Sequence, residues 1–223
     1  MRIIGVHRSA PAQLAMIGCA ILVFYANGQA RAQTPPGTDE VQEDWVLVIQ
    51  ATSPEETAPQ IANVISPVGN IDAEYGVLEL NQTTQPDYQD GGNQLQRWNG
   101  SFLCDYRPTA PHDRLQTANE TISYTMTMSV ANRNLNFGVQ NGKSQTWGSF
   151  GGNGSQWRSQ TESAYADLSQ YDRKVSTEHT RVCFASNLVS TFTQTQVRYY
   201  QAGQLLKTDT IKIEVYKATT SAE

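Results

Sequence analysis

The chain has 223 residues, and its 16 lysines and arginines against 21 aspartates and glutamates give a net charge of −5 near pH 7. This sign argues against nucleic acid or an anionic membrane as a partner, because binding to a polyphosphate needs clustered positive charge. The length is sufficient for one domain with a substantial core.

The N-terminal segment has the parts of a secretory signal. A basic lead-in precedes an apolar stretch over residues 14–25, and a short polar tail ends at Ala30 and Ala32. A membrane-spanning helix needs roughly twenty apolar residues, whereas a shorter run followed by small residues suits a signal peptide and its peptidase. We therefore predict a signal peptide over residues 1–32 and cleavage before Gln33. The mature protein is then secreted or extracytoplasmic, with no membrane contact.

Two alternatives remain open for this segment. Cys19 and the three residues before it loosely resemble the box of a lipoprotein signal, although the apolar run continues beyond that cysteine. An uncleaved membrane anchor is the other alternative. Removal of residues 1–32 takes away three arginines and no acidic residue. The mature chain then has 13 basic and 21 acidic residues, a net charge of −8.

The rest of the chain divides into three parts. Residues 33–43 are rich in proline and acidic side chains, which predicts a flexible leader. Residues 44–218 form a single domain in this interpretation, and residues 219–223 form a disordered tail.

The domain opens with an apolar run from Trp45 to Ile49, which is typical of a short strand buried on both faces. Half-buried strands are expected at residues 77–80 and 95–98, on either side of a polar loop over residues 81–93. Trp45 and Trp98 are both expected in the core.

The clearest strand signal lies between Thr121 and Val130, where apolar and polar residues alternate, so that one face is core and the other is solvated. Its apolar positions are Ile122, Tyr124, Met126, Met128 and Val130. A turn at residues 131–134 leads into a second alternating strand at residues 135–139. Asn141-Gly142 then supplies another turn that tolerates positive φ.

Two long strands are expected near the C-terminus, at residues 188–200 and 205–216, joined by a turn between them. Only residues 163–171 have helical spacing, enough for one or two turns. Strands separated by turns, without a βαβ rhythm, predict an all-β fold, an antiparallel β-sandwich or jelly roll.

Cys104 and Cys183 are the two cysteines of the predicted mature chain, and each lies in an apolar, strand-like run. In an oxidising compartment the pair could form a disulfide worth about 2–4 kcal/mol. Two buried thiols are the alternative. Nothing beside either cysteine indicates a catalytic nucleophile, and His112 and His179 have no metal-ligand spacing with them.

Part of the chain resembles a known superfamily. Residues 124–152, with Asn141-Gly142, Thr146-Trp147-Gly148 and Phe150-Gly151-Gly152, are similar to the second half of a concanavalin A-like lectin/glucanase sandwich, and residues 182–209 are similar to its closing strands. Secreted bacterial sandwiches of this type are the nearest resemblance, which implies a fold but no activity.

The resemblance implies glycan hydrolysis as one chemistry. Retaining glucanases of this superfamily carry an E-x-D-x-x-E motif, because two carboxylates must face the scissile bond from one side at about 5 Å from each other. The nearest approach here is Asp72-Ala73-Glu74 with Glu79, whose spacing does not place the carboxylates on one face. The chain also has no G-x-S-x-G, phosphate-binding or HExxH motif. We therefore assign no catalytic residue, and the sequence favours a non-catalytic protein while leaving an enzyme open.

Sugar binding is the second implied chemistry, since an aromatic ring can stack on a pyranose while polar groups bind its hydroxyls. Trp147 and Trp157 flank a glycine-rich loop containing Asn153, and these three residues are the candidate binding set, with core packing as the alternative for each tryptophan. Lectins of this superfamily often use calcium. Oxygen ligands at Asp87, Asp90 and Asn93 are a weak candidate site, and turn formation explains the same residues.

Three functions follow as hypotheses. The first is an exported, non-catalytic domain that binds polysaccharide or cell-surface glycan, with no required cofactor. The second is a structural or adhesive surface protein without a small-molecule site, which the long Thr-rich strands favour. A glycoside hydrolase is the third and least supported.

Overall fold

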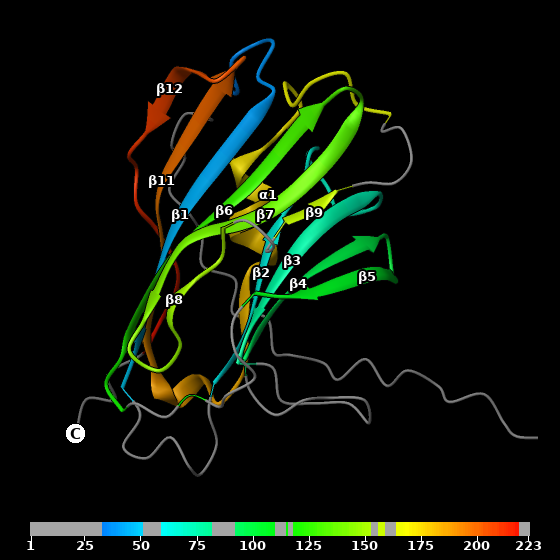
Figure 1. Cartoon of the computed structure of the whole chain (residues 1–223). Coiled ribbons are helices and arrows are strands. Elements are labelled where there is room, and N and C mark those ends of the chain that lie inside the picture. Colours follow the sequence, from blue (N-terminus) through cyan, green and yellow to red (C-terminus); the bar gives the residue numbers. More distant parts are fainter. Residues whose placement is uncertain are drawn as a thin grey trace, which may run out of the picture. The chain divides into compact units, whose positions relative to one another are not determined.

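The computed structural model describes residues 33–50, 59–81, 92–109, 115, 118–152, 156–158 and 164–218 (Figure 1). The predicted signal peptide and the C-terminal tail lie outside these residues. Within the described ranges, no helix combines the length and the apolar character needed to span a membrane.

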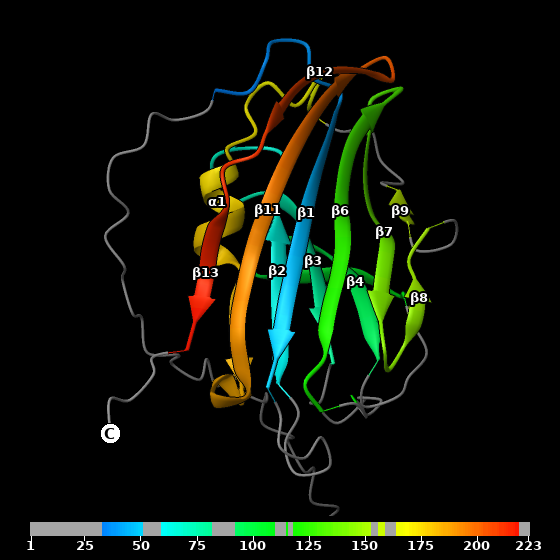
Figure 2. The same cartoon turned by 90° about the vertical axis from the view of Figure 1, so that its left-hand side faces the viewer.

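In the described part of the chain, thirteen strands form two antiparallel sheets. Figures 1 and 2 show how the two sheets are arranged. The larger sheet has eight strands: β1 (Glu40–Ile49), β6 (Thr121–Ala131), β7 (Asn134–Ser144), β8 (Gly148–Phe150), β9 (Gln156–Arg158), β11 (Val189–Gln201), β12 (Gln204–Asp209) and β13 (Ile213–Lys217). Its order is β12-β11-β1-β6-β7-β8, with β13 also paired to β11 and β9 to β7.

The smaller sheet has five strands in the order β10-β2-β3-β4-β5. They are β2 (Gln60–Ile65), β3 (Glu74–Leu80), β4 (Asn93–Asn99), β5 (Phe102–Pro108) and β10 (Arg181–Phe184). The predicted all-β antiparallel sandwich is confirmed, while jelly-roll connectivity stays a prediction.

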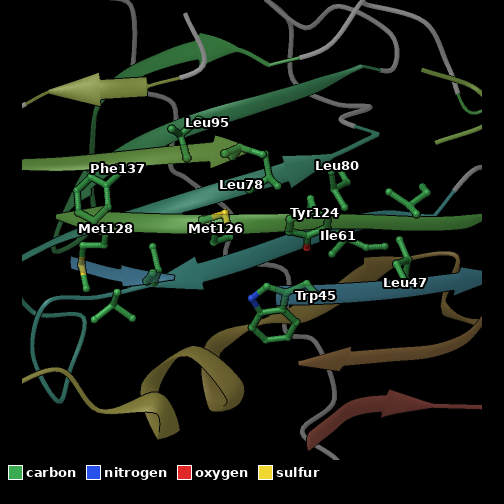
Figure 3. Close-up of a cluster of buried hydrophobic side chains, with 14 of the residues drawn as sticks. Trp45, Leu47, Ile61, Leu78, Leu80, Leu95, Tyr124, Met126, Met128 and Phe137 are labelled. Carbon is green, nitrogen blue, oxygen red and sulfur yellow. The ribbon is translucent and has the colours of Figure 1, made fainter. Parts of the chain in front are cut away.

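The main core lies between the inner faces of the two sheets. Figure 3 shows side chains from both sheets in this cluster, including Trp45, Leu47, Ile61, Leu78, Leu80, Leu95, Tyr124, Met126, Met128 and Phe137. All five apolar positions predicted on β6 are buried. β3 approaches the facing sheet so closely that a Cβ on Gly76 would lie 2.7 Å from the Phe137 ring.

Two expectations for the start of the domain are corrected. β1 begins at Glu40 rather than Trp45, and buried and half-buried residues alternate along it, because only one of its faces meets the core. The predicted flexible leader is structured in part. Thr34 and Thr38 are buried, and the Thr34 hydroxyl donates to the Tyr171 carbonyl at 2.7 Å.

The hairpin between β6 and β7 is confirmed, with Asn132 and Arg133 at positive φ in its turn. The second predicted turn is wrong. Asn141 and Gly142 lie within β7, where the register with β6 shifts between Ser123 and Thr125. Asn141 adopts a positive φ of 57°. At this position the positive φ accompanies a β-bulge within the strand instead of a chain reversal.

The helix lies after the predicted segment. α1 covers Arg173–His179, and the Asp172 carboxylate caps it by accepting from the Lys174 amide at 2.9 Å. The described part of the predicted segment, residues 164–171, is a loop whose apolar side chains are buried. Leu168 and Tyr171 enter the core, and the Leu168 amide donates to the Thr38 carbonyl at 2.7 Å.

The final strand is divided in two. The turn between β11 and β12 is confirmed, but β12 ends at Asp209 and β13 begins at Ile213. The Asp209 carboxylate accepts from the Ile211 amide at 3.0 Å and pairs with Arg173 at 3.1 Å. This local bond breaks the strand and ties the break to α1.

A buried carboxyl joins β1 to α1 and the loop before it. Glu43 is completely buried on the inner face of the larger sheet. Its carboxyl accepts from the Tyr171 hydroxyl at 2.6 Å, the Ser176 hydroxyl at 2.5 Å and the Trp45 indole nitrogen at 3.0 Å. Burial raises the pKa of Glu43, and these hydrogen bonds offset part of the rise.

We predict a specific pH dependence for Glu43→Gln. Because the pKa of Glu43 is raised, the native state binds the proton more tightly than the unfolded chain does. The contribution of Glu43 to stability therefore falls as the pH rises above 4.5, the ordinary pKa of this side chain. The glutamine variant does not titrate at this position. The stability advantage of the wild type over the variant should therefore shrink from pH 4.5 to pH 7.5, as measured by urea unfolding at both pH values.

Two further variants complete this test. Glu43→Ala leaves three buried donors without their acceptor and should cost at least about 3 kcal/mol at either pH. Glu40→Gln, on the same strand, is the control and should change stability little. A Glu43→Gln difference that grows with pH would contradict the assignment.

Candidate ligand-binding face

The smaller sheet carries a second apolar surface, on the side away from the core. We call it the outer face. A groove of about 280 Å³ lies on this face. It is lined by Ala62, Val64, Ile71, Tyr75, Val77, Glu79, Gln96, Trp98, His179, Arg181 and Cys183.

Strand alternation explains this surface. On β3, Leu78 and Leu80 face the core, so the alternating residues Tyr75, Val77 and Glu79 face outward. Val64, Tyr75 and Val77 form a hydrophobic cluster separate from the main core. The sheet is therefore apolar on both faces.

Two stacked aromatic rings form one end of the groove. Tyr75 on β3 and Trp98 on β4 are cross-strand neighbours, with ring centroids 6.4 Å apart and planes 13° from parallel. Tyr75 is buried, and its hydroxyl donates to the Gly100 carbonyl at 3.0 Å. Trp98 remains half-buried, and its indole nitrogen donates to Gln96 at 2.7 Å. Trp98 thus presents a flat ring of fixed orientation to the groove.

The other end is polar. Ala62 on β2 pairs with Glu79 on one side and with Arg181 on the other, so its small side chain separates an acid from a base. Burial raises the pKa of the Glu79 carboxyl, and hydrogen bonds from Gln94 and Gln96 offset part of that rise. Gln94 donates to Glu79 at 3.3 Å.

His179 lies beside this polar end, at the last residue of α1. Burial lowers the pKa of its imidazole, and the nearby positive charge of Arg181 lowers it further. The Arg181 guanidinium donates to the His179 carbonyl at 3.3 Å and is exposed. Burial raises the pKa of the Tyr75 hydroxyl, and the nearby positive charge of Arg181 offsets part of this rise. The groove therefore combines aromatic, cationic, acidic and amide groups.

The carboxylates considered for glycan hydrolysis do not meet. Glu74 and Glu79 are five residues apart on β3 and point to opposite faces of the sheet. Glu74 pairs with Arg97 at 3.1 Å, whereas Glu79 lies in the groove. A retaining pair needs both carboxyls on one side of the substrate, so Glu74 and Glu79 cannot act together in this way.

The sequence-predicted sugar-binding residues do not form a site within the described structure. Trp147 is 5% exposed and packs edge-on against Phe150 in the core, so it cannot stack on a ligand. Trp157 lies on β9 opposite Phe137, with only its backbone described. Asn153 lies outside the described residues.

The predicted calcium site is likewise not assembled from described residues. Asp87 and Asp90 lie outside them. Asn93 is buried, and its side-chain oxygen accepts from the Asn81 amide at 3.1 Å, so it closes the end of the β3–β4 connection. No cluster of three or more His, Cys, Asp or Glu side chains suited to a metal occurs among the described residues.

The predicted disulfide is not formed. Cys104 lies on β5 and Cys183 on β10, the two opposite edges of the smaller sheet. Three strands between them impose a separation of roughly 19 Å, far beyond the ~7 Å limit between the Cα atoms of a disulfide. The alternative of two buried thiols is also corrected, because Cys104 is exposed and Cys183 is half-buried.

Sequence reasoning missed the outer face because Trp98 was expected in the core. The available signal was the pattern of β3, where apolar residues occupy both alternating sets. Such a strand either lies between two layers or leaves an apolar surface outside.

Searches against protein-family models, curated proteins and solved structures found no match to this chain.

We predict that the two cysteines of the folded protein are not linked to each other. The exposed Cys104 should react first with a thiol reagent under native conditions, and Cys183 should react more slowly because it is half-buried. Peptide mapping of air-oxidised protein checks this. A Cys104–Cys183 cross-linked peptide from folded monomer would contradict the strand order of the smaller sheet.

Proposed function

We propose that this protein is an exported, non-catalytic domain that binds extracellular carbohydrate on the outer face of its smaller sheet. The observation that carries the proposal is the half-buried Trp98 ring, stacked on Tyr75 beside the side chains of Gln96 and Glu79. Export rests on the N-terminal signal pattern of residues 1–32.

The chemistry of the groove suits a sugar ring. The apolar face of a pyranose can stack on Trp98, as amphipathic ligands do on exposed indoles. Glu79, Gln96 and Arg181 then offer acceptors and donors to its hydroxyls. A purely apolar ligand would displace water from these polar groups without replacing its hydrogen bonds, which costs affinity.

The size and shape favour part of a longer chain over a small, enclosed ligand. The groove volume of about 280 Å³ is slightly below the roughly 300–1,000 Å³ of small-molecule sites. An open sheet face can contact one or two sugar units while the rest of a polysaccharide extends into solvent.

Trp98→Ala is the decisive variant. It removes the stacking surface, and we expect the affinity for a glycan identified on an array to fall at least tenfold, about 1.4 kcal/mol. Isothermal titration calorimetry of the purified domain measures this. Phe102→Ala is the matched control, because Phe102 is an aromatic residue that is 78% exposed on β5 and does not line the groove.

The outcomes separate the competing functions. Absence of binding to every glycan, with and without calcium, would contradict the proposal and favour a structural or adhesive protein. Binding that Trp98→Ala leaves unchanged would place the site elsewhere. Turnover of a bound glycan that is lost in Glu79→Gln would support an enzyme instead.

A further inference from the structure

The apolar character of the outer face continues past the groove onto β5. Leu103 on β5 is the cross-strand neighbour of Trp98, and Tyr106 is that of Gln96. Because paired residues project from the same side of a sheet, Leu103 and Tyr106 lie on the outer face beside two residues that line the groove. Leu103 is 46% exposed and Tyr106 is 59% exposed. The outer face therefore extends one strand further than the groove.

The backbone of β5 does not favour a further strand as the partner of these side chains. Cys104 lies in a β-bulge, and Pro108 has no amide hydrogen to donate. The Tyr106 amide donates to the Asp105 carboxylate at 2.8 Å, so this donor is already used. Addition of a strand needs a regular row of free donors and acceptors, which β5 lacks. The side chains of β5, more than its backbone, are therefore the groups suited to contact a ligand.

Trp98 and Tyr106 lie diagonally across the β4–β5 pair. Trp98 is two residues beyond Gln96, the cross-strand neighbour of Tyr106, and such diagonal neighbours are roughly 7–8 Å apart. Adjoining sugar rings of one chain can reach both aromatic side chains at this separation. The Tyr106 ring offers an apolar face, and its hydroxyl can donate and accept hydrogen bonds. Tyr106 thus has the same two properties that make Trp98 suited to a sugar.

We propose that Tyr106 forms a second sugar-stacking position, so that the outer face takes an extended glycan chain instead of a single terminal sugar. This inference rests on the function proposed above and specifies its ligand. One ring of the chain stacks on Trp98 in the groove, and a neighbouring ring stacks on Tyr106, with Leu103 as an apolar contact beside them. The chain then runs across the strands, from the groove toward the β5 edge.

Binding of linear oligosaccharides of increasing length tests this arrangement. The probes are β-1,4-linked oligomers of glucose, xylose, mannose and N-acetylglucosamine, each from one to six units long. Such chains are extended, so successive rings can follow the face of a sheet. Isothermal titration calorimetry measures the affinities, with NMR titration for the weakest ligands. For at least one series, we expect affinity to rise with length until the chain covers both Trp98 and Tyr106.

Tyr106→Ala should remove the gain in affinity that accompanies chain length. We expect the affinity for the longest oligomer to fall roughly three- to tenfold, the value of one aromatic contact, and the affinity for the single sugar to stay unchanged. Tyr106→Phe keeps the ring and should retain most of the gain. Trp98→Ala, in contrast, should weaken the binding of short and long oligomers alike.

Phe102→Ala is the matched control. Phe102 is an exposed aromatic residue of the same strand, but its cross-strand neighbour is Asn99. Successive residues of a strand alternate between the two faces, so Phe102 and Asn99 belong to the opposite side of the sheet from Trp98. The removal of Phe102 should leave the length dependence unchanged. Thermal unfolding of each variant checks that it is folded.

The outcomes separate this inference from the proposed function. Glycan binding that depends on Trp98 but not on Tyr106 would overturn the inference and leave the function standing. An equal loss for one sugar unit and for six in Tyr106→Ala would also overturn it, and so would failure of all four series to bind. Absence of binding to every glycan overturns both proposals. Self-association of the glycan-free protein that Tyr106→Ala abolishes would instead assign the exposed side chains of β5 to a protein contact.

Discussion

The interior of the sandwich depends on one buried carboxyl. Glu43 belongs to β1, a central strand of the larger sheet, yet its three hydrogen-bond donors include Tyr171 and Ser176 from the segment that contains α1. α1 in turn contacts β2 of the smaller sheet and β13 of the larger one. Burying an acid is costly unless its oxygens are hydrogen-bonded, so this contact holds only when the loop and the helix are in place. Because the buried Glu43 carboxyl needs these hydrogen bonds, the position of α1 is linked to the packing of both sheets.

Packing in the core also fixes the inner face of the smaller sheet. Its inner face is committed to the core, and Gly76 permits the close approach to Phe137 that this requires. The outer face is nevertheless apolar around Val64, Tyr75 and Val77. The solvent-facing side of an antiparallel sheet is ordinarily polar, so the apolar side chains here are not explained by packing in the core. This apolar surface lies next to Glu79, Arg181 and Trp98, and this combination is the physical basis for proposing that the face binds a ligand.

The sequence predicted the two-sheet class because alternation on β6 and β7 is strong and local. The predictions from sequence were wrong where contacts between distant parts of the chain determine burial. The burial of Thr38 and Glu43 depends on residues more than a hundred positions later in the chain, so the structured start of the domain resembled a leader. Core packing, the alternative for Trp147, is confirmed, but Trp98 was assigned the wrong surroundings for a related reason: the alternation places a residue on one face of its strand but does not say which faces acquire a second layer. Strand order, which separates Cys104 from Cys183, is likewise invisible to local patterns.

The two edges of the smaller sheet differ in how much apolar surface they expose. Each has a bulge at its cysteine, between Val182 and Phe184 on β10 and between Leu103 and Asp105 on β5. β10, however, contacts β13 and follows directly from α1, so neighbouring elements cover that edge. β5 contacts β9, but its apolar side chains Phe102, Leu103 and Tyr106 remain exposed. The bulge at Cys104, the proline at position 108 and the bond from the Tyr106 amide to the Asp105 carboxylate limit the backbone groups that β5 offers to a further strand. The β5 edge therefore leaves apolar side chains in solvent beside the outer face while its backbone disfavours extension of the sheet.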